Sequence, residues 1–162
     1  MAIRTMGPSG QCDNEPGAAE AALPELLAPA GGLDQMLAAV SAHGFTDDEF
    51  LRGCVVAHAH GVRVYVTLNV FVFDDELADA VALGAHAHEL GADALIVADA
   101  GLACALRAAI PGVEIHLSTQ AGVHSEGAVR LAADELGVER VTTARELAVD
   151  EIAALCATGV PI

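Results

Sequence analysis

Hydrophobic residues recur along this chain with two different periods, and from residue 61 onward segments with one period alternate with segments that have the other. Apolar residues at every second position predict strands, and apolar residues at every third or fourth position predict helices. Strands and helices that alternate in this way are typical of parallel β/α units. In chain order, strands are expected over 62–69, 94–99, 114–120 and 140–144, and helices over 74–90, 102–110, 125–136 and 149–158.

The region before residue 61 is organised differently. Residues 1–22 mix Gly, Pro, Ser, Asn and Glu without an apolar period, which predicts a disordered leader and places the folded domain over 23–162. A short strand is expected over 25–30, followed by a glycine turn and by helices over 33–43 and 46–60. The second helix opens with a capping box, T-D-D-E. The pattern contains no strand between these two helices.

The predicted strands have one apolar and one mixed face. In the strand over 114–120, Ile115 and Leu117 share one face, whereas His116 and Ser118 share the other. The strand expected over 62–69 likewise has apolar residues on one face and more polar residues on the other. An apolar outer face under helices and a polar inner face favour a partial TIM-type (β/α) barrel with parallel strands. An open doubly wound sheet is the second candidate, because its strands are more often apolar throughout.

A glycine followed by Val or Ala marks each point where a helix is expected to give way to a strand. These glycines are Gly61, Gly91, Gly112, Gly137 and Gly159, and each is expected to end its helix in a left-handed conformation. The last is followed only by 160–162, so a further strand is expected to begin there. The sequence therefore predicts a truncated barrel that also lacks one internal strand, between the helices over 33–43 and 46–60.

Composition and charge narrow the function classes. The 162 residues are 54% hydrophobic, and 23 acidic residues against 7 arginines give a formal net charge of -16. Such a field repels phosphate backbones, which argues against a bare nucleic-acid-binding module. The four cysteines lie far apart, as free thiols in a reducing compartment would. We find no signal peptide and no apolar stretch that is long enough to span a bilayer, so a cytoplasmic protein without a membrane partner is expected.

In either parallel architecture, functional groups gather at the carboxyl ends of the strands. Polar residues are expected to form a ring around this edge together with the inward-facing His116 and Ser118. The alternative is that single members of the ring only cap helices or satisfy loop backbone. The other members are Asn69, Asp99, Gln120, His124, Arg145 and Glu146.

The sequence also contains residue types suited to nucleophilic catalysis and to metal binding. A nucleophile arrangement of Ser118, His116 or His124, and Asp99 is conceivable, although the chain has no G-x-S-x-G elbow. The histidines at 58 and 60, and those at 86 and 88, resemble metal ligands. Both pairs fall on expected helices, where a spacing of two residues turns the side chains about 200° apart, so neither pair can chelate one ion. No metal site is predicted.

The order of motifs resembles the amino-terminal half of the collagenase-like peptidases, peptidase family U32. The blocks that carry this resemblance are PELLAPAG at 24–31, GVRVYVTLN at 61–69, GADALIV at 91–97, HLSTQ at 116–120 and ARELAVDEI at 144–152. The resemblance implies a TIM-type barrel. Members of the family are named as peptidases, although several resemble RNA-hydroxylation proteins or oxygen-independent hydroxylases of quinone biosynthesis, some with an iron-sulfur cluster.

The resemblance and the strand faces together select the candidate site residues. Expected catalytic residues are His116, Ser118, Gln120, Arg145 and Glu146, and expected substrate-binding residues are Asn69, Asp99, Thr119 and His124. A peptide or an RNA is the substrate class that the resemblance implies, and the cofactor stays open. The cysteine-rich block of the family lies beyond Ile162, so cluster ligands cannot be assigned to Cys12, Cys54, Cys104 or Cys156.

Three functional hypotheses follow. The preferred one is a fragment of a collagenase-like peptidase, a hydrolase with a partial barrel. The second is an RNA- or quinone-hydroxylation protein of the same family, which requires the cysteine block. The third is a non-catalytic, degenerate half-barrel that associates with itself through its open sheet edges.

Overall fold

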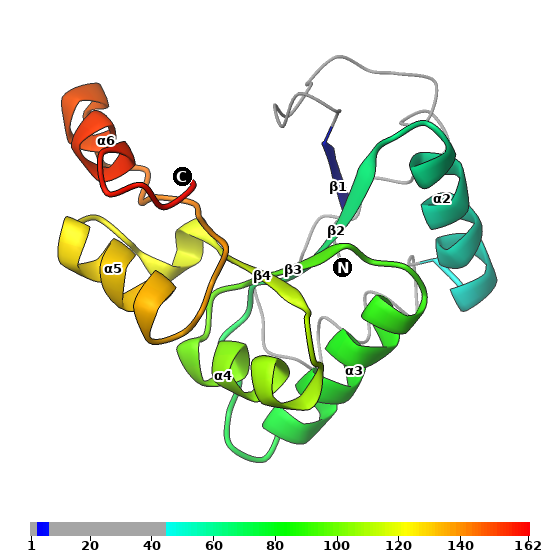
Figure 1. The fold of residues 1–162 in the computed structure, drawn as a ribbon. Helices are drawn as coiled ribbons and strands as arrows, with labels where there is room; N and C mark the ends of the chain where they lie inside the picture. The colour runs from blue at the N-terminus through cyan, green and yellow to red at the C-terminus, as the bar shows by residue number, and fades with distance from the viewer. Residues whose placement is uncertain (1–2, 7–44) are drawn as a thin grey trace.

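The structure, a computed structural model, describes residues 3–6 and 45–162. Five strands form one sheet, and five α-helices and a short 3-10 helix connect and cover them (Figure 1). In chain order the elements are β1 (Ile3–Met6), α2 (Asp47–Ala59), β2 (Arg63–Leu68), α3 (Leu77–Glu89), β3 (Ala94–Val97), α4 (Ala100–Ala109), β4 (Glu114–Leu117), η2 (Thr119–Ala121), α5 (Glu126–Asp134), β5 (Arg140–Val141) and α6 (Val149–Cys156).

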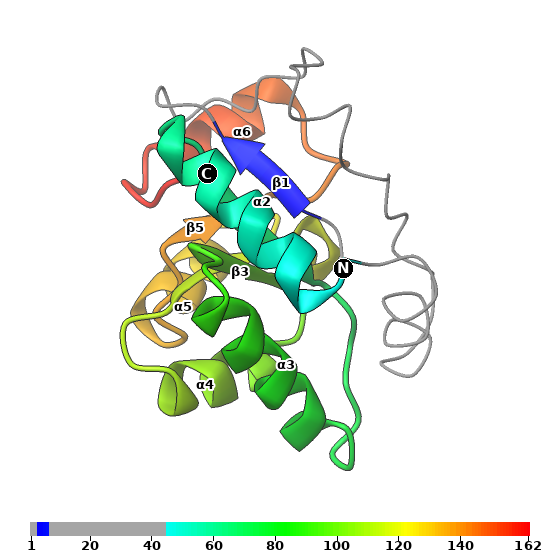
Figure 2. The same ribbon diagram turned by 90° about the vertical axis from the view of Figure 1, so that its right-hand side faces the viewer.

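The sheet follows the order of the sequence, β1-β2-β3-β4-β5, with β2 to β5 parallel and β1 antiparallel to β2. The helices follow one another around the outer side of the parallel strands, as Figures 1 and 2 show. The predicted α/β class with parallel β/α units is therefore confirmed. The reversal of strand order that defines a doubly wound sheet does not occur among the strands of the described residues.

The structure departs from the sequence prediction near the amino terminus. Residues 3–6, which were expected to belong to a disordered leader, form β1, and Ile3 pairs with Val66 at one end of this ladder and Met6 with Arg63 at the other. The strand expected over 25–30 and the helix expected over 33–43 lie outside the described residues, as does any strand between that helix and α2.

The helices expected from residues 46, 125 and 149 begin within one residue of those positions in the structure. Thr46 and Glu49 form the predicted capping box, with the Thr46 N–H donating to Glu49 Oε2 over 2.8 Å and the Glu49 N–H donating to Thr46 Oγ1 over 3.3 Å. Asp99 and Ser125 accept in the same way from the first turns of α4 and α5. The predicted left-handed glycines are also confirmed, since all five junction glycines have φ between 67° and 112°.

The core lies between the sheet and its helices. Val66, Leu95 and Ile115 from neighbouring strands belong to this core and are almost fully buried. Leu102 and Leu106 of α4 pack into the same core and are fully buried. The helix α3 approaches this layer so closely that a Cβ atom added at Gly84 would lie 2.5 Å from a methyl group of Leu106 and 3.2 Å from one of Leu95. A residue larger than glycine therefore requires these side chains to move.

Two acidic residues form hydrogen bonds with the backbone at the amino ends of the parallel strands. The Asp93 N–H donates to Val64 O over 2.8 Å, and Asp93 Oδ2 accepts from the Val64 N–H over 2.7 Å. Glu139 repeats this arrangement on Ile115, with distances of 2.9 Å and 2.8 Å. In each case the acidic residue lies directly before one strand and forms two hydrogen bonds with the preceding strand in the sequence. The strand pairs β2–β3 and β4–β5 therefore share the same hydrogen-bonding pattern at their amino ends.

Residues 160–162 lie beside β5. The Val141 N–H donates to Pro161 O over 2.9 Å, and Val160 and Ile162 pack against the core. This segment follows β5 in the same sequential order as the strands before it.

Candidate functional site

The face of the sheet that turns away from the helices carries the polar residues expected there. In register across the parallel strands, Thr67 pairs with Ile96, Ile96 with His116, and His116 with Arg140. His116 is 3% exposed and Ser118 is 4% exposed. Alternation along β4 therefore places the His116 imidazole on the inner face, with the Ser118 hydroxyl directly after the strand, and both residues are buried.

His116 belongs to a compact polar cluster that joins β2 to β4. Its Nε2 lies 2.7 Å from Glu114 Oε1, and the Arg63 guanidinium donates from two nitrogens to the two oxygens of the same carboxylate, one of them over 3.1 Å. The Tyr65 ring meets the His116 ring edge to face with centroids 4.8 Å apart, and the Arg63 guanidinium carbon lies 5.2 Å from the Tyr65 centroid. These four residues, Arg63, Tyr65, Glu114 and His116, are called the inner-face cluster below.

Burial and charge act in opposite directions on this cluster. Burial lowers the pKa of His116 below its usual 6.5, and the nearby Arg140 and Arg63 lower it further, although the hydrogen bond to Glu114 opposes the shift. Burial raises the pKa of Glu114, but the hydrogen bonds from Arg63 and His116 outweigh it, so that the net pKa falls below 4.5. Near neutral pH the cluster therefore combines a neutral imidazole, a carboxylate and a guanidinium.

The residues that follow β4 are ordered by local hydrogen bonds. Ser118 begins η2 and its Oγ accepts from the Gln120 N–H over 3.3 Å, while Thr119 Oγ1 donates to Thr143 O over 2.6 Å. Gly122 then ends the short helix with φ 69°. Gln120 is exposed at the carboxyl edge of the sheet, so among these residues its amide is the one free to meet a ligand.

The remaining candidates stand at the same edge but on separate segments. Asn69 is half-buried directly after β2, and Asp99 is half-buried after β3, where its Oδ1 accepts from the Leu102 N–H over 2.9 Å. His124 is exposed, and its Nδ1 lies 2.7 Å from Gly122 O. The two residues of the last candidate pair, Arg145 and Glu146, are exposed after β5.

The geometry does not assemble a Ser-His-Asp relay. Asp99 caps α4 and the Nε2 of His116 faces Glu114, so the three side chains serve different partners. Sequence reasoning missed the two contacts of His116, with Tyr65 and Glu114, and it missed Arg63, which binds Glu114. Alternation alone would have put Glu114 on the face of His116, whereas Arg63 could be found only from the pairing of strands far apart in sequence.

The cysteines of the described residues do not fit an iron-sulfur cluster. Cys54 lies in the core under α2, and burial raises the pKa of its thiol to about 11. Cys104 and Cys156 are exposed on two different helices, α4 and α6. Cluster ligands must be thiolates gathered around one point, and within residues 45–162 no group of three or more Cys, His, Asp or Glu side chains is placed to hold a metal ion.

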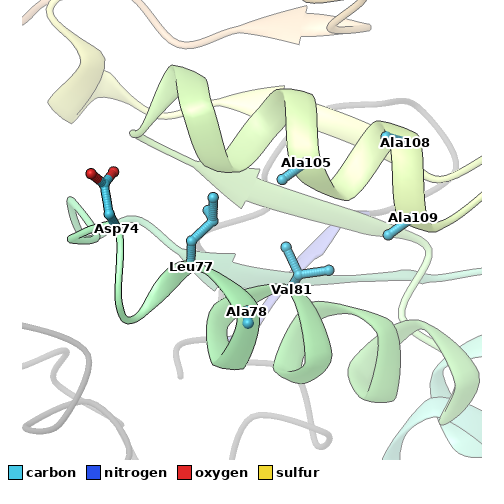
Figure 3. A pocket seen from close by; sticks show the side chains of 7 residues that line it. All are labelled: Asp74, Leu77, Ala78, Val81, Ala105, Ala108 and Ala109. Atoms are coloured by element: carbon cyan, nitrogen blue, oxygen red, sulfur yellow. The ribbon is translucent and has the colours of Figure 1, made fainter.

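An apolar groove on the outer surface lies apart from these residues. It runs between α3 and α4, on the helix side of the sheet (Figure 3). The residues that line it are Asp74, Leu77, Ala78, Val81, Ala105, Ala108 and Ala109. Apart from the carboxylate of Asp74 at one end, the lining is aliphatic, and none of the candidate site residues takes part in it. The inner face and the carboxyl edge remain the candidate site.

Sequence comparison decides the family. The profile of peptidase family U32 matches residues 31–162. The chain belongs to this family. No solved structure matches the chain significantly, and among the helices of the described residues none is long and apolar enough to cross a membrane.

Individual relatives of this U32 chain carry names from RNA modification. It is 38% identical over 99 residues to the 23S rRNA 5-hydroxycytidine C2501 synthase of Escherichia coli, a match that covers 61% of this chain and 14% of the relative. It is 35% identical over 150 residues to the tRNA hydroxylation protein P1 of Bacillus subtilis, covering 80% of this chain and 35% of the relative. The chain thus spans about a third or less of these relatives.

The preferred prediction of a peptidase is wrong. A collagenase of Porphyromonas gingivalis is also similar, at 27% identity over 147 residues, with 79% of this chain and 34% of the relative covered. The RNA-modifying relatives are more similar than this collagenase, at 38% and 35% identity. The comparisons therefore favour the alternative of an RNA-hydroxylation protein over that of a protease.

Proposed function

We propose that this chain forms the substrate-binding part of a protein that hydroxylates RNA. The observation that carries the proposal is the 35% identity to a tRNA hydroxylation protein over 80% of the chain. Because the chain spans only 35% of that relative, the proposal assigns it substrate binding and orientation. The cysteines of the described residues do not fit an iron-sulfur cluster, so the proposed role of this chain includes no cluster chemistry.

The proposed architecture is a β/α barrel formed over 23–162. Its support is the sequential order of β2 to β5, with the helices of the described residues on the outer side of these strands (Figure 1), which is the arrangement of consecutive barrel strands. The segment 160–162 beside β5 adds to this support, because it continues the same order. In a barrel the inner-face cluster faces the interior and the carboxyl ends of the strands form the mouth.

The proposed site joins the inner face to this mouth. His116 on β4 contributes a neutral imidazole, Ser118 directly after this strand contributes a hydroxyl, and Gln120 contributes an exposed amide. Arg145 and Glu146 contribute charges on the neighbouring loop. In this proposal they form the reacting side of the site, and the substrate is held by Asn69, Asp99, Thr119 and His124.

The substrate class that fits this surface is an unpaired nucleobase. A net charge of -16 disfavours contacts with phosphates, so base recognition has to supply the affinity. Phe71 and Phe73 in the loop after β2 are 61% and 74% exposed, and the alternating residues Val70 and Val72 pack on the core. Exposed aromatic rings on an anchored backbone are suited to stacking with bases that lie outside a duplex.

The backbone of this loop is fixed. The Phe73 N–H donates to Glu76 Oε2 over 2.9 Å, and the Glu76 N–H donates to Phe73 O over 2.9 Å. The adjacent carboxylates of Asp74 and Asp75 repel phosphate groups, which again favours contact through the face of a base.

Deletion of the gene in its source organism tests the proposal. Nucleosides from digested tRNA and rRNA are compared by mass spectrometry for loss of a product that carries one added oxygen. We expect the product to vanish on deletion and to return with the wild-type gene, but not with His116→Ala at equal protein level. The control His60→Ala, which changes an exposed histidine at the end of α2, should restore the product. An unchanged nucleoside profile in the deletion strain refutes the proposed function.

A further inference from the structure

We propose that Glu114 is a positioning residue that keeps the proton of His116 on Nε2, so that Nδ1 presents a lone pair to the substrate. The inference rests on the proposed function, in which His116 is a site residue. Its structural basis is the distance of 2.7 Å between His116 Nε2 and Glu114 Oε1, within a strand where both side chains share the inner face.

The tautomer follows from the chemistry of the two partners. A neutral imidazole carries one proton, and an ionised carboxylate can only accept a hydrogen bond. The nitrogen that faces Glu114 must therefore be the protonated one, and Nδ1 must be the acceptor. A substrate N–H or O–H can donate to Nδ1 in this state, and Nδ1 can also take up a proton.

Arg63 fixes the carboxylate that performs this task. Its two terminal nitrogens donate to the two Glu114 oxygens, which sets the plane of the carboxylate as well as its position. The edge-to-face contact with Tyr65 restrains the imidazole from the β2 side. The position of the ring proton of His116 is thus determined by three side chains, Arg63 and Tyr65 on β2 and Glu114 on β4.

A second Arg–Glu pair shows how a purely structural carboxylate differs. Glu139 Oε2 accepts from the backbone N–H of Ile115 over 2.8 Å as well as from Arg107, so its loss would leave a strand amide unpaired. Among the hydrogen bonds of the described residues, the carboxylate of Glu114 accepts only from the side chains of Arg63 and His116. Its contacts therefore serve the orientation of another side chain, while those of Glu139 hold the backbone.

The test is nitrogen NMR of the His116 ring in this chain, since the shifts of protonated and unprotonated ring nitrogens differ. In wild type near neutral pH we expect Nε2 protonated and Nδ1 unprotonated. In Glu114→Gln we expect a growing population with the proton on Nδ1, because the amide NH2 can donate to Nε2. In Glu114→Asp the shorter carboxylate should restore part of the wild-type signal. Glu139→Gln is the matched control and should leave the ring shifts of His116 unchanged.

The titration of the same ring is a second readout. The groups that face His116 are Arg63 and Tyr65 on β2, Glu114 on β4 and Arg140 on β5. Loss of the Glu114 charge removes the group that raises the pKa of His116, so its midpoint should fall further in Glu114→Gln. A wild-type ring protonated on Nδ1, or a Glu114→Gln ring with unchanged tautomer and midpoint, overturns the inference.

Nucleoside analysis in the deletion strain separates this inference from the proposed function. In a serine protease, an Asp-to-Asn change that leaves the histidine in the wrong tautomer lowers kcat by about 10⁴-fold with the geometry intact. We therefore expect Glu114→Gln to lower product formation strongly and Glu114→Asp to recover part of it. Wild-type product levels in Glu114→Gln, with the tautomer changed, overturn the positioning role while the function stands. If the deletion strain shows no change, the proposed function fails, and the ring shifts still decide whether Glu114 directs the proton.

Discussion

Asp93 holds Val64 by two hydrogen bonds at once, one through its backbone N–H over 2.8 Å and one through its Oδ2 over 2.7 Å. His58 Nε2 also lies 2.8 Å from the same carboxylate oxygen. Replacement by Ala leaves the N–H of the buried Val64 without its partner, so we expect Asp93→Ala to lower the free energy of unfolding by about 1–3 kcal/mol. Asp93→Asn keeps an acceptor oxygen and should lose less. Urea unfolding followed by circular dichroism measures both.

The control for this prediction is Asp134→Ala, which removes an exposed carboxylate from the end of α5. Exposed positions of this kind change stability within about 0.5 kcal/mol. If Asp93→Ala unfolds at the same urea concentration as Asp134→Ala, the side-chain bond of Asp93 does not stabilise the sheet.

Two helical glycines offer a matched pair of substitutions. Ala in place of Gly within a helix gains about 1 kcal/mol from backbone entropy alone. An added Cβ at Gly53 in α2 meets no atom within 4 Å, so Gly53→Ala should be stabilising. At Gly84 the added atom would lie 2.5 Å from Leu106 and 3.2 Å from Leu95, and overpacking of about 1–3 kcal/mol should cancel or exceed the gain. Thermal unfolding that places both variants above wild type would show that α3 can move outward freely.

Acidification should weaken the fold in two steps. The lowered pKa of buried His116 means that the unfolded chain binds protons more readily than the folded one, so stability is complete above pH 6.5 and falls as pH drops from there toward the lower folded-state pKa. The lowered pKa of Glu114 acts in the same sense, with stability lost as pH falls below 4.5. His116→Gln should flatten the first step. Urea unfolding at about pH 8 and about pH 5.5 checks this, and an equal slope in wild type and variant would contradict it.

The exposed phenylalanines after β2 should contribute to RNA affinity. Stacking of one base on an aromatic side chain contributes about 1–3 kcal/mol, so Phe73→Ala should weaken binding of a single-stranded oligoribonucleotide, while Phe73→Tyr should not. Fluorescence anisotropy measures the affinity at several salt concentrations. Because few phosphates are neutralised, the dependence on salt should be shallow. Leu131→Ala removes an apolar side chain from α5 that is 59% exposed and serves as the control. Equal losses in both alanine variants would argue against stacking.

Local signals in the sequence were enough to predict the helices of residues 45–162, with their ends displaced by up to three residues. Thr46, Asp99 and Ser125 cap helices because their side-chain oxygens reach amides within the first turn, a relationship that spans three residues. Where prediction and structure differ, a nearby hydrogen bond explains the difference. The helix α3 begins at residue 77 and not at 74, because Phe73 and Glu76 form a closed turn first. β5 ends at Val141, because the Ala144 N–H turns to Val123 O.

The site was harder to predict, because its contacts join distant parts of the chain. Alternation placed His116 on the inner face, and burial of that residue agrees with the prediction. Arg63 and Glu114 are 51 residues apart and meet only because β2, β3 and β4 pair in one particular register. Asp99, which was expected to bind substrate, also caps α4, so its substrate-binding role stays a prediction. A single sequence contains no signal for register between strands so far apart.

The edge-to-face contact of Tyr65 with His116 also provides a spectroscopic reporter. The chain has one tyrosine and no tryptophan, so its near-ultraviolet absorbance and emission come almost entirely from that one phenol ring. The ring centroid lies 4.8 Å from that of the imidazole, and the Arg63 guanidinium covers the phenol from another side. Without any label or mutation, tyrosine fluorescence of the native protein therefore follows protonation or ligand binding at the inner face of the sheet.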